Sequence, residues 1–131
     1  MIRMPQDNVE GFRRLSNHIL ELTGGDFLLS DQFSHFCRKY EIYEIWSGLL
    51  TSAMDRPDLY GDEITRSALG HLLEHISRER RAEFPGILRE ILTFFAKKTC
   101  YSSYFSTVKQ DLLSLGFTPD EAESSLPKAG S

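Results

Sequence analysis

Two histidines one helical turn apart, His71 and His75, are the residues whose types and spacing most directly suggest a chemistry in this chain. They belong to the stretch HLLEH, in which Glu74 stands beside the second histidine. Residues four apart lie on one face of a helix, so both imidazoles could bind one zinc ion while the carboxylate acts as base on a bound water. Hydrolysis by such a site requires a third protein ligand.

The longer stretch ALGHLLEHI, residues 68–76, is similar to the signature of pitrilysin-type inverted zincins. The resemblance implies that His71 and His75 bind zinc, that Glu74 is the base, and that a distant second glutamate completes the site. It covers nine residues, and the family carries its motif in a larger α+β domain, whereas this sequence predicts no strands. The late carboxylates that could serve as third ligand are Asp111, Asp120, Glu121 and Glu123. Zinc-dependent hydrolysis is therefore our third hypothesis.

A second spacing suggests phosphate chemistry, because Arg66 and His71 satisfy the pattern R-x4-H, which Arg13 and His18 repeat. This spacing resembles the motif of helical HEPN-type ribonucleases, in which Arg and His from paired subunits converge on the RNA backbone. The resemblance implies that His71 acts as general acid and base and that Arg66 stabilises phosphate charge. In RSALGH, Ser follows the arginine where the family usually has Asn or Asp. A metal-independent ribonuclease is our second hypothesis, since it requires no absent third ligand.

Helical periodicity determines which of these residues can meet. Apolar residues recur at three- and four-residue spacing in six to seven segments separated by Gly, Pro and capping residues. The first expected segment begins at Asp7 or Asn8 and stops at Gly24-Gly25, and the next begins at Ser30-Asp31 and runs through Ala53, as one helix or as two with a bend near Tyr40. A further segment runs from Asp62 to about Arg81, and another follows Phe84-Pro85-Gly86 and ends at Lys97-Lys98. The last two follow an aromatic linker, residues 99–105, to end at Gly116, and run from a Thr118 cap to Leu126. We predict an all-α fold, a single compact bundle of about six to seven helices in residues 1–126, with 127–131 as a flexible tail or the start of a linker.

Both histidines fall at one flank of the apolar face of the fourth segment. At 100° per residue and with His71 at zero, the apolar stripe spans about 20° to 200°, and His75 and Glu74 lie at about 40° and 300°. The stripe consists of Ile64, Ala68, Leu69, Leu72, Leu73 and Ile76. The interpretation that we favour is two boundary histidines that form hydrogen bonds or face solvent.

Composition sets the class of protein. The chain has 131 residues and a net charge of −4, so the chain as a whole does not favour binding to a phosphate backbone. Cys37 and Cys100 form no CxxC pair, which fits free thiols in a reducing compartment. The sequence shows no signal peptide and no apolar run long enough for a membrane span. We expect a cytoplasmic protein without membrane contact.

Four aromatic residues near expected turns are candidate interface anchors: Tyr60, Tyr101, Tyr104 and Phe117. The leading hypothesis is a non-enzymatic helical protein-interaction or regulatory module without a cofactor. Its partner would be another protein or a second copy of the chain in a homodimer, and nucleic acid is a minor alternative.

Overall fold

The computed structural model describes residues 5–23, 26–95 and 101–126, which form seven α-helices, one 3₁₀ helix and, within these ranges, no strand. The elements are α1 (Pro5–Thr23), the 3₁₀ helix η1 (Asp26–Leu29), α2 (Asp31–Lys39), α3 (Tyr43–Met54), α4 (Asp62–Glu79), α5 (Phe84–Phe95), α6 (Tyr101–Ser114) and α7 (Pro119–Ser124). The predicted all-α bundle of six to seven helices is confirmed.

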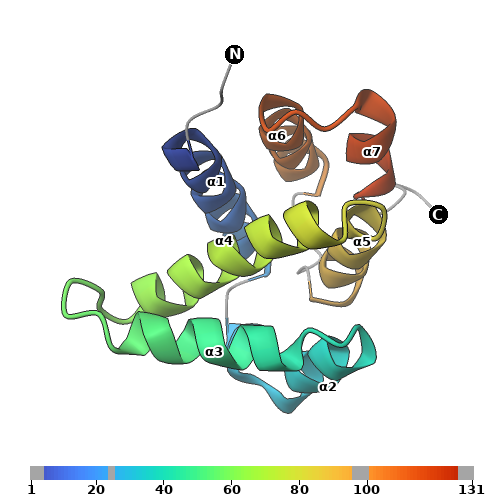
Figure 1. Cartoon of the computed structure of the whole chain (residues 1–131). Helices are drawn as coiled ribbons and strands as arrows, with labels where there is room; N and C mark the ends of the chain where they lie inside the picture. Colours follow the sequence, from blue (N-terminus) through green and yellow to red (C-terminus); the bar gives the residue numbers. More distant parts are fainter. Residues whose placement is uncertain (1–4, 24–25, 96–100, 127–131) are drawn as a thin grey trace.

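Helix α4 is the central element of the bundle. It lies between α1 and α3 and packs along both, while α1 also packs against α6 (Figure 1). Helix α5 contacts α1, α4 and α7, so it closes the bundle beside the end of α4. Within the described ranges, none of the helices is both long enough and apolar enough to cross a membrane.

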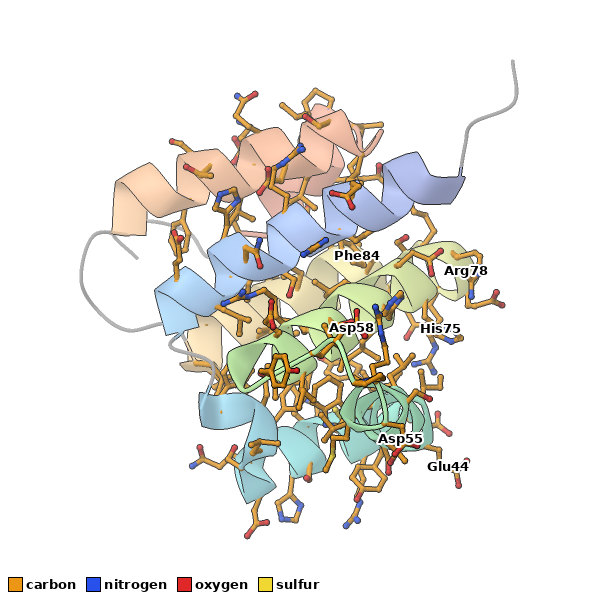
Figure 2. All side chains as sticks on the ribbon, turned by 90° about the vertical axis from the view of Figure 1, so that its left-hand side faces the viewer. Glu44, Asp55, Asp58, His75, Arg78 and Phe84 are labelled. Atoms are coloured by element: carbon orange, nitrogen blue, oxygen red, sulfur yellow. The ribbon has the colours of Figure 1, made fainter. Side chains whose placement is uncertain are left out.

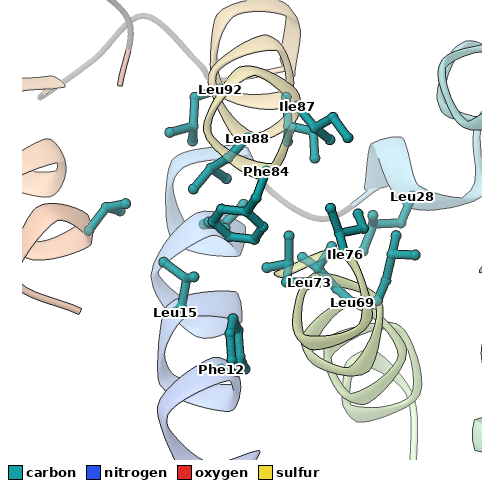
Figure 3. Close-up of a cluster of buried hydrophobic side chains, with 14 of the residues drawn as sticks. Phe12, Leu15, Leu28, Leu69, Leu73, Ile76, Phe84, Ile87, Leu88 and Leu92 are labelled. Carbon is teal, nitrogen blue, oxygen red and sulfur yellow. The ribbon is translucent and has the colours of Figure 1, made fainter. Parts of the chain in front are cut away.

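The apolar stripe of α4 forms the middle of the core. Ala68, Leu69, Leu72, Leu73 and Ile76 are fully buried, as the angles predict, and only Ile64 is half-buried. Figure 3 shows Leu69, Leu73 and Ile76 of α4 facing a group of buried side chains from α1 and α5. That group includes Phe12, Leu15, Phe84, Ile87, Leu88 and Leu92. Burial of these side chains fixes the face that α4 turns outward.

An aromatic cluster around Phe33 joins η1, α2, α3 and α5. The ring centroid of Phe33 lies 5.2 Å from that of Phe27, 5.7 Å from Phe36, 5.2 Å from Trp46 and 6.0 Å from Phe95. Edge-on and offset contacts of this kind stabilise a core beyond the area that they bury. No pattern in the sequence predicted η1. This short helix places Phe27 against Phe33.

Several predicted helix boundaries differ from the structure. Helix α1 begins at Pro5, before the expected caps Asp7 and Asn8, because proline fits the first helical turn. For the same reason Phe84-Pro85-Gly86 opens α5, and the break after α4 lies at residues 80–83 instead. The expected aromatic linker is helical from Tyr101 onward. Gly24-Gly25, Lys97-Lys98 and the tail 127–131 lie outside the described residues.

Other local predictions are confirmed. Ser30 caps α2 by accepting a hydrogen bond from Phe33 N at 3.2 Å. The segment after it forms two helices, and Glu41, with φ of 59°, lies at the bend between them. Gly116 has φ of 97°, the left-handed conformation expected of a residue that ends a helix. Thr118 and Glu121 form the predicted capping box.

Glu121 also ties α7 to the turn that follows α4. Its two carboxylate oxygens accept hydrogen bonds from Arg81 Nη2 at 3.0 Å and Arg81 Nε at 3.1 Å. These bonds, followed by the bond from the Thr118 backbone, lower the pKa of Glu121 from 4.5 to about 2. The ionised carboxylate therefore stabilises the folded state.

We expect the stabilisation by Glu121 to disappear in acid. A lowered pKa means that the contribution is complete above pH 4.5 and is lost as the pH falls towards about 2. Because both side chains are partly exposed, Glu121→Gln should cost no more than about 1 kcal/mol at pH 7. The difference in free energy of unfolding between wild type and variant, measured with urea at several pH values, should shrink across that window.

The control for this pH dependence is Glu123→Gln, which removes a carboxylate of the same helix whose side chain is 65% exposed. Its effect should stay smaller at pH 7. A Glu121→Gln effect that does not change with pH would contradict the stabilising role of the ionised carboxylate.

Candidate functional site

A cleft of about 250 Å³ lies between α1, the α3–α4 loop and α4. Charged side chains dominate its lining: Arg13 comes from α1, Arg56 and Asp58 from the loop, and Glu63, Arg66 and His71 from α4. Figure 2 looks onto this side of the molecule, with the loop that carries Asp58 passing in front of α4. The structure therefore places both residues of the Arg66–His71 pair in the same cleft.

Small residues let α1 and α4 approach each other at the floor of the cleft. A Cβ atom on Gly70 would lie 3.5 Å from the Phe12 carbonyl oxygen and 3.6 Å from Arg13 Cα, in ordinary van der Waals contact. Ser16 Oγ, which is fully buried, donates a hydrogen bond to the Arg66 carbonyl oxygen at 3.0 Å. This close contact brings Arg13 and Arg66 to the same opening from two different helices.

Arg66 and His71 leave α4 in different directions, because five residues correspond to a rotation of about 140° around a helix. Glu63, Gly70 and Glu74 lie in the sector between them and also line the cleft. The spacing along α4 therefore does not itself bring the guanidinium and the imidazole together.

The acidic residues of the cleft already have hydrogen-bond donors. Asp58 accepts bonds from Arg56 Nη2 at 2.6 Å and Nε at 3.2 Å, and the bond from Arg56 lowers the pKa of Asp58. Glu74 accepts two bonds from Arg78 Nη1, at 2.8 and 2.6 Å. Glu63 Oε1 accepts a bond from the backbone N–H of Tyr60 at 3.2 Å. Two of the three carboxylates are thus paired with a guanidinium.

The two remaining arginines of the cleft lack such partners. Arg66 Nε is buried and has no hydrogen-bond acceptor among the residues that the structure describes. Arg13 Nη1 lies 3.7 Å from Glu10 Oε1, and both side chains are more than 60% exposed, which makes this a weak surface contact. The cleft consequently offers guanidinium donors to a ligand. An uncompensated guanidinium that is partly buried costs free energy until an anion pairs with it.

The zinc alternative finds no third ligand in the described part of the chain. His71 is exposed, and His75 Nδ1 lies 3.5 Å from Arg78 Nη2. The same arginine donates hydrogen bonds to Glu74. The late glutamates are engaged elsewhere, Glu121 by Arg81 and Glu123 by Lys109. No group of three His, Cys, Asp or Glu side chains that could hold a metal ion occurs among the described residues. In the structure, Glu74 of this motif forms an ion pair with Arg78 on the surface of α4.

The second R-x4-H match has a structural explanation. His18 Nδ1 forms a hydrogen bond with Asp111 Oδ2, which joins α1 to α6. The Asp111 side chain is 8% exposed and that of His18 is 24% exposed. Of the two matches, only Arg66 and His71 therefore both face the cleft.

The four interface candidates have different environments. Tyr60 is 75% exposed, as expected. An interface anchor should be exposed, and for Phe117 this expectation is wrong, because its side chain is only 4% exposed. The left-handed turn at Gly116 directs the Phe117 ring against Phe84, with ring centroids 4.8 Å apart. The Arg81 guanidinium covers the ring from 4.2 Å. The side chains of Tyr101 and Tyr104 lie outside the described residues.

Cys37 is buried in the core, and desolvation raises the pKa of its thiol to about 12. A thiol with this pKa remains protonated at neutral pH and is a poor nucleophile. Cys100 lies outside the described residues.

No motif in the sequence pointed to Arg56, to Glu63 or to a place for Arg13 in the cleft. A signal for them was present in the small residues Ser16 and Gly70, which mark positions where two helices can approach closely. Which helices meet there could not be read from local periodicity. No family model, curated protein or solved structure matches this chain.

Proposed function

We propose that this chain is a non-enzymatic protein-interaction module that binds an acidic segment of its partner in the cleft between α1 and α4. The observation that carries the proposal is the pair of cleft arginines: among the described residues Arg66 Nε has no acceptor, and Arg13 has only the exposed Glu10 at 3.7 Å. A guanidinium presents a rigid fork of donors that pairs with an anionic group in two parallel hydrogen bonds. The acidic side chains of the same cleft are already hydrogen-bonded, so they compete little for these donors.

Exposed apolar side chains in and beside the α3–α4 loop, part of which lines the cleft, support the same function. Tyr60 follows Leu59, which lines the cleft, and Met54, at the end of α3, is 63% exposed. Tyrosine, methionine and arginine are enriched in protein interfaces, and tyrosine and arginine dominate their energetic centres. The α3–α4 loop thus adds an apolar contact next to the charged one.

A labelled peptide tests this function directly. A fluorescein-labelled peptide of alternating glutamate and leucine should bind saturably in an anisotropy titration and should dissociate as the salt concentration rises. Arg66→Gln should weaken binding at least about tenfold, or about 1.4 kcal/mol. The matched control is Arg89→Gln, which removes an exposed arginine of α5 that does not line the cleft. Equal affinity for both variants, or no saturable binding, would refute the proposal.

A second copy of the chain has the required chemistry, since the sequence contains 19 acidic residues. We expect the wild type to be a dimer at about 10 μM, a concentration at which interfaces of this class associate. Light scattering should show that Tyr60→Ala or Arg66→Gln shifts it towards the monomer. A wild-type monomer at this concentration would exclude the second copy and leave a different protein as the partner.

A metal-independent ribonuclease is the second candidate, and the observation that favours it is that Arg66 and His71 line one cleft. Because Arg66 and His71 leave α4 in different directions, a second copy of the chain would have to supply the Arg or His that completes each site. The resemblance to HEPN-type ribonucleases implies the same arrangement. We expect no cleavage of single-stranded RNA in the presence of EDTA. Cleavage that both Arg66→Gln and His71→Asn abolish in an intact dimer would replace the interaction function.

A further inference from the structure

We propose that the anionic group recognised in this cleft is a phosphorylated side chain of the protein partner. The proposal rests on the interaction function above and narrows the chemistry of the bound segment from acidic to phosphorylated. Arginine clusters are a recurring means of recognising phosphorylated motifs in proteins.

The cleft carries a net positive charge. Arg56 and Arg78 neutralise Asp58 and Glu74, while Glu63 accepts a bond only from a neutral backbone N–H. The remaining charges are those of Arg13, Arg66 and Glu63, which sum to +1. A phosphate monoester carries about −1.5 to −2 at neutral pH, whereas a carboxylate carries −1. Because the attraction to a positive site grows with the charge of the anion, the monoester is attracted more strongly than a glutamate.

The donors of the cleft come from two directions. Arg66 and Arg13 belong to two helices that touch at Gly70, so their guanidinium groups approach the opening from different sides. A phosphate monoester has three acceptor oxygens and can accept hydrogen bonds from both groups at once.

The volume of the cleft suits a single side chain better than a whole small molecule. The cleft encloses about 250 Å³, below the roughly 300–1,000 Å³ typical of sites for whole small-molecule ligands. This volume suits one side chain, while Leu59 at its wall and the exposed Tyr60 beside it can contact flanking residues of a bound segment. A phosphorylated residue within a protein segment would use both features.

The experiment compares three pentapeptides, Gly-Leu-Xaa-Leu-Gly, in which Xaa is phosphoserine, glutamate or serine. Each is titrated into the full ¹⁵N-labelled chain at pH 7.5 and followed by amide chemical shifts. The phosphoserine peptide should bind at least about tenfold more tightly than the glutamate peptide, because it pairs with two guanidinium groups instead of one. The serine peptide should not bind.

Variants connect the affinity to named residues. Arg66→Gln should weaken binding of the phosphoserine peptide at least about tenfold. Arg66→Lys keeps the charge and loses the paired donors of the guanidinium, so its affinity should lie between those of Arg66→Gln and the wild type. Glu63→Gln should strengthen binding about two- to fivefold by removing the one cleft carboxylate without a cationic partner. Arg89→Gln is the matched control and should leave the affinity unchanged. The amide spectrum of each variant shows directly whether it is folded.

Four outcomes would overturn the proposal. Equal affinity for the glutamate and phosphoserine peptides would retain the acidic-segment function and reject phosphate as its ligand, and no binding of either peptide would reject both. Inorganic phosphate that binds more tightly than the phosphoserine peptide would assign the cleft to the free ion. A single-stranded RNA hexamer that binds more tightly than the peptide would assign it to nucleic acid.

Discussion

Phe84→Ala is expected to lower the free energy of unfolding by about 3 to 5 kcal/mol. The side chain is fully buried at the start of α5. Its ring stacks on Phe117 with centroids 4.8 Å apart and meets Phe12 edge-on at 6.4 Å. Truncation therefore opens a cavity that α1, α5 and the α6–α7 turn all border. Urea unfolding followed by far-UV circular dichroism measures the loss.

Phe94→Ala provides a matched control, because it makes the same chemical change ten residues along the same helix. Phe94 is 66% exposed, and its truncation should change the free energy of unfolding by no more than about 0.5 kcal/mol. Similar losses for the two variants would show that a change in the unfolded state, and not the Phe84 cavity, dominates the effect.

Local periodicity and capping chemistry explain why much of the fold could be predicted. The α4 stripe from Ala68 to Ile76 is buried as predicted because every residue of a helix face shares one environment. Ser30 and Thr118 cap the helices that follow them because their side chains satisfy backbone N–H groups within three residues. These signals act over one helical turn, so one sequence contains all the information that they require.

Burial near turns could not be predicted in the same way. Phe117 directly follows the glycine that ends α6, and its ring stacks on that of Phe84, more than thirty positions earlier in the sequence. The turn after Gly116 determines only the direction of the chain. The neighbour that covers Phe117 is decided by the packing of α5 against α7.

The candidate site was predictable in part for the same reason. The spacing of Arg66 and His71 identifies two residues of α4 that line the cleft. The cleft itself depends on α1 and the α3–α4 loop, which contribute Arg13 and Arg56 from distant parts of the sequence. Whether an arginine is paired decides whether it can bind an anion, and pairing depends on these tertiary neighbours. Arg78 and Arg66 look alike in the sequence, but of the two only Arg78 has carboxylate partners among the described residues.

His18→Ala is expected to lower the free energy of unfolding by about 2 to 3 kcal/mol, the second large effect on stability. The substitution removes the hydrogen-bond partner of Asp111, whose side chain is 8% exposed, and leaves that carboxylate without its partner between α1 and α6. The value lies below that for a fully buried pair because the His18 side chain is 24% exposed. His35→Ala, a change at an exposed histidine of α2, is the control and should have little effect.

A double-mutant cycle separates the His18–Asp111 contact from the packing around it. The Asp111 side chain is itself only 8% exposed, so an apolar side chain at position 111 would also be buried. Changing both partners, His18→Leu with Asp111→Leu, removes the desolvated charge together with its partner and should restore most of the stability that either single change loses. Single losses that simply add in the double variant would mean that the two side chains are not coupled. In that case apolar packing alone, through Val108 and Leu112 of α6, would hold α6 against the bundle.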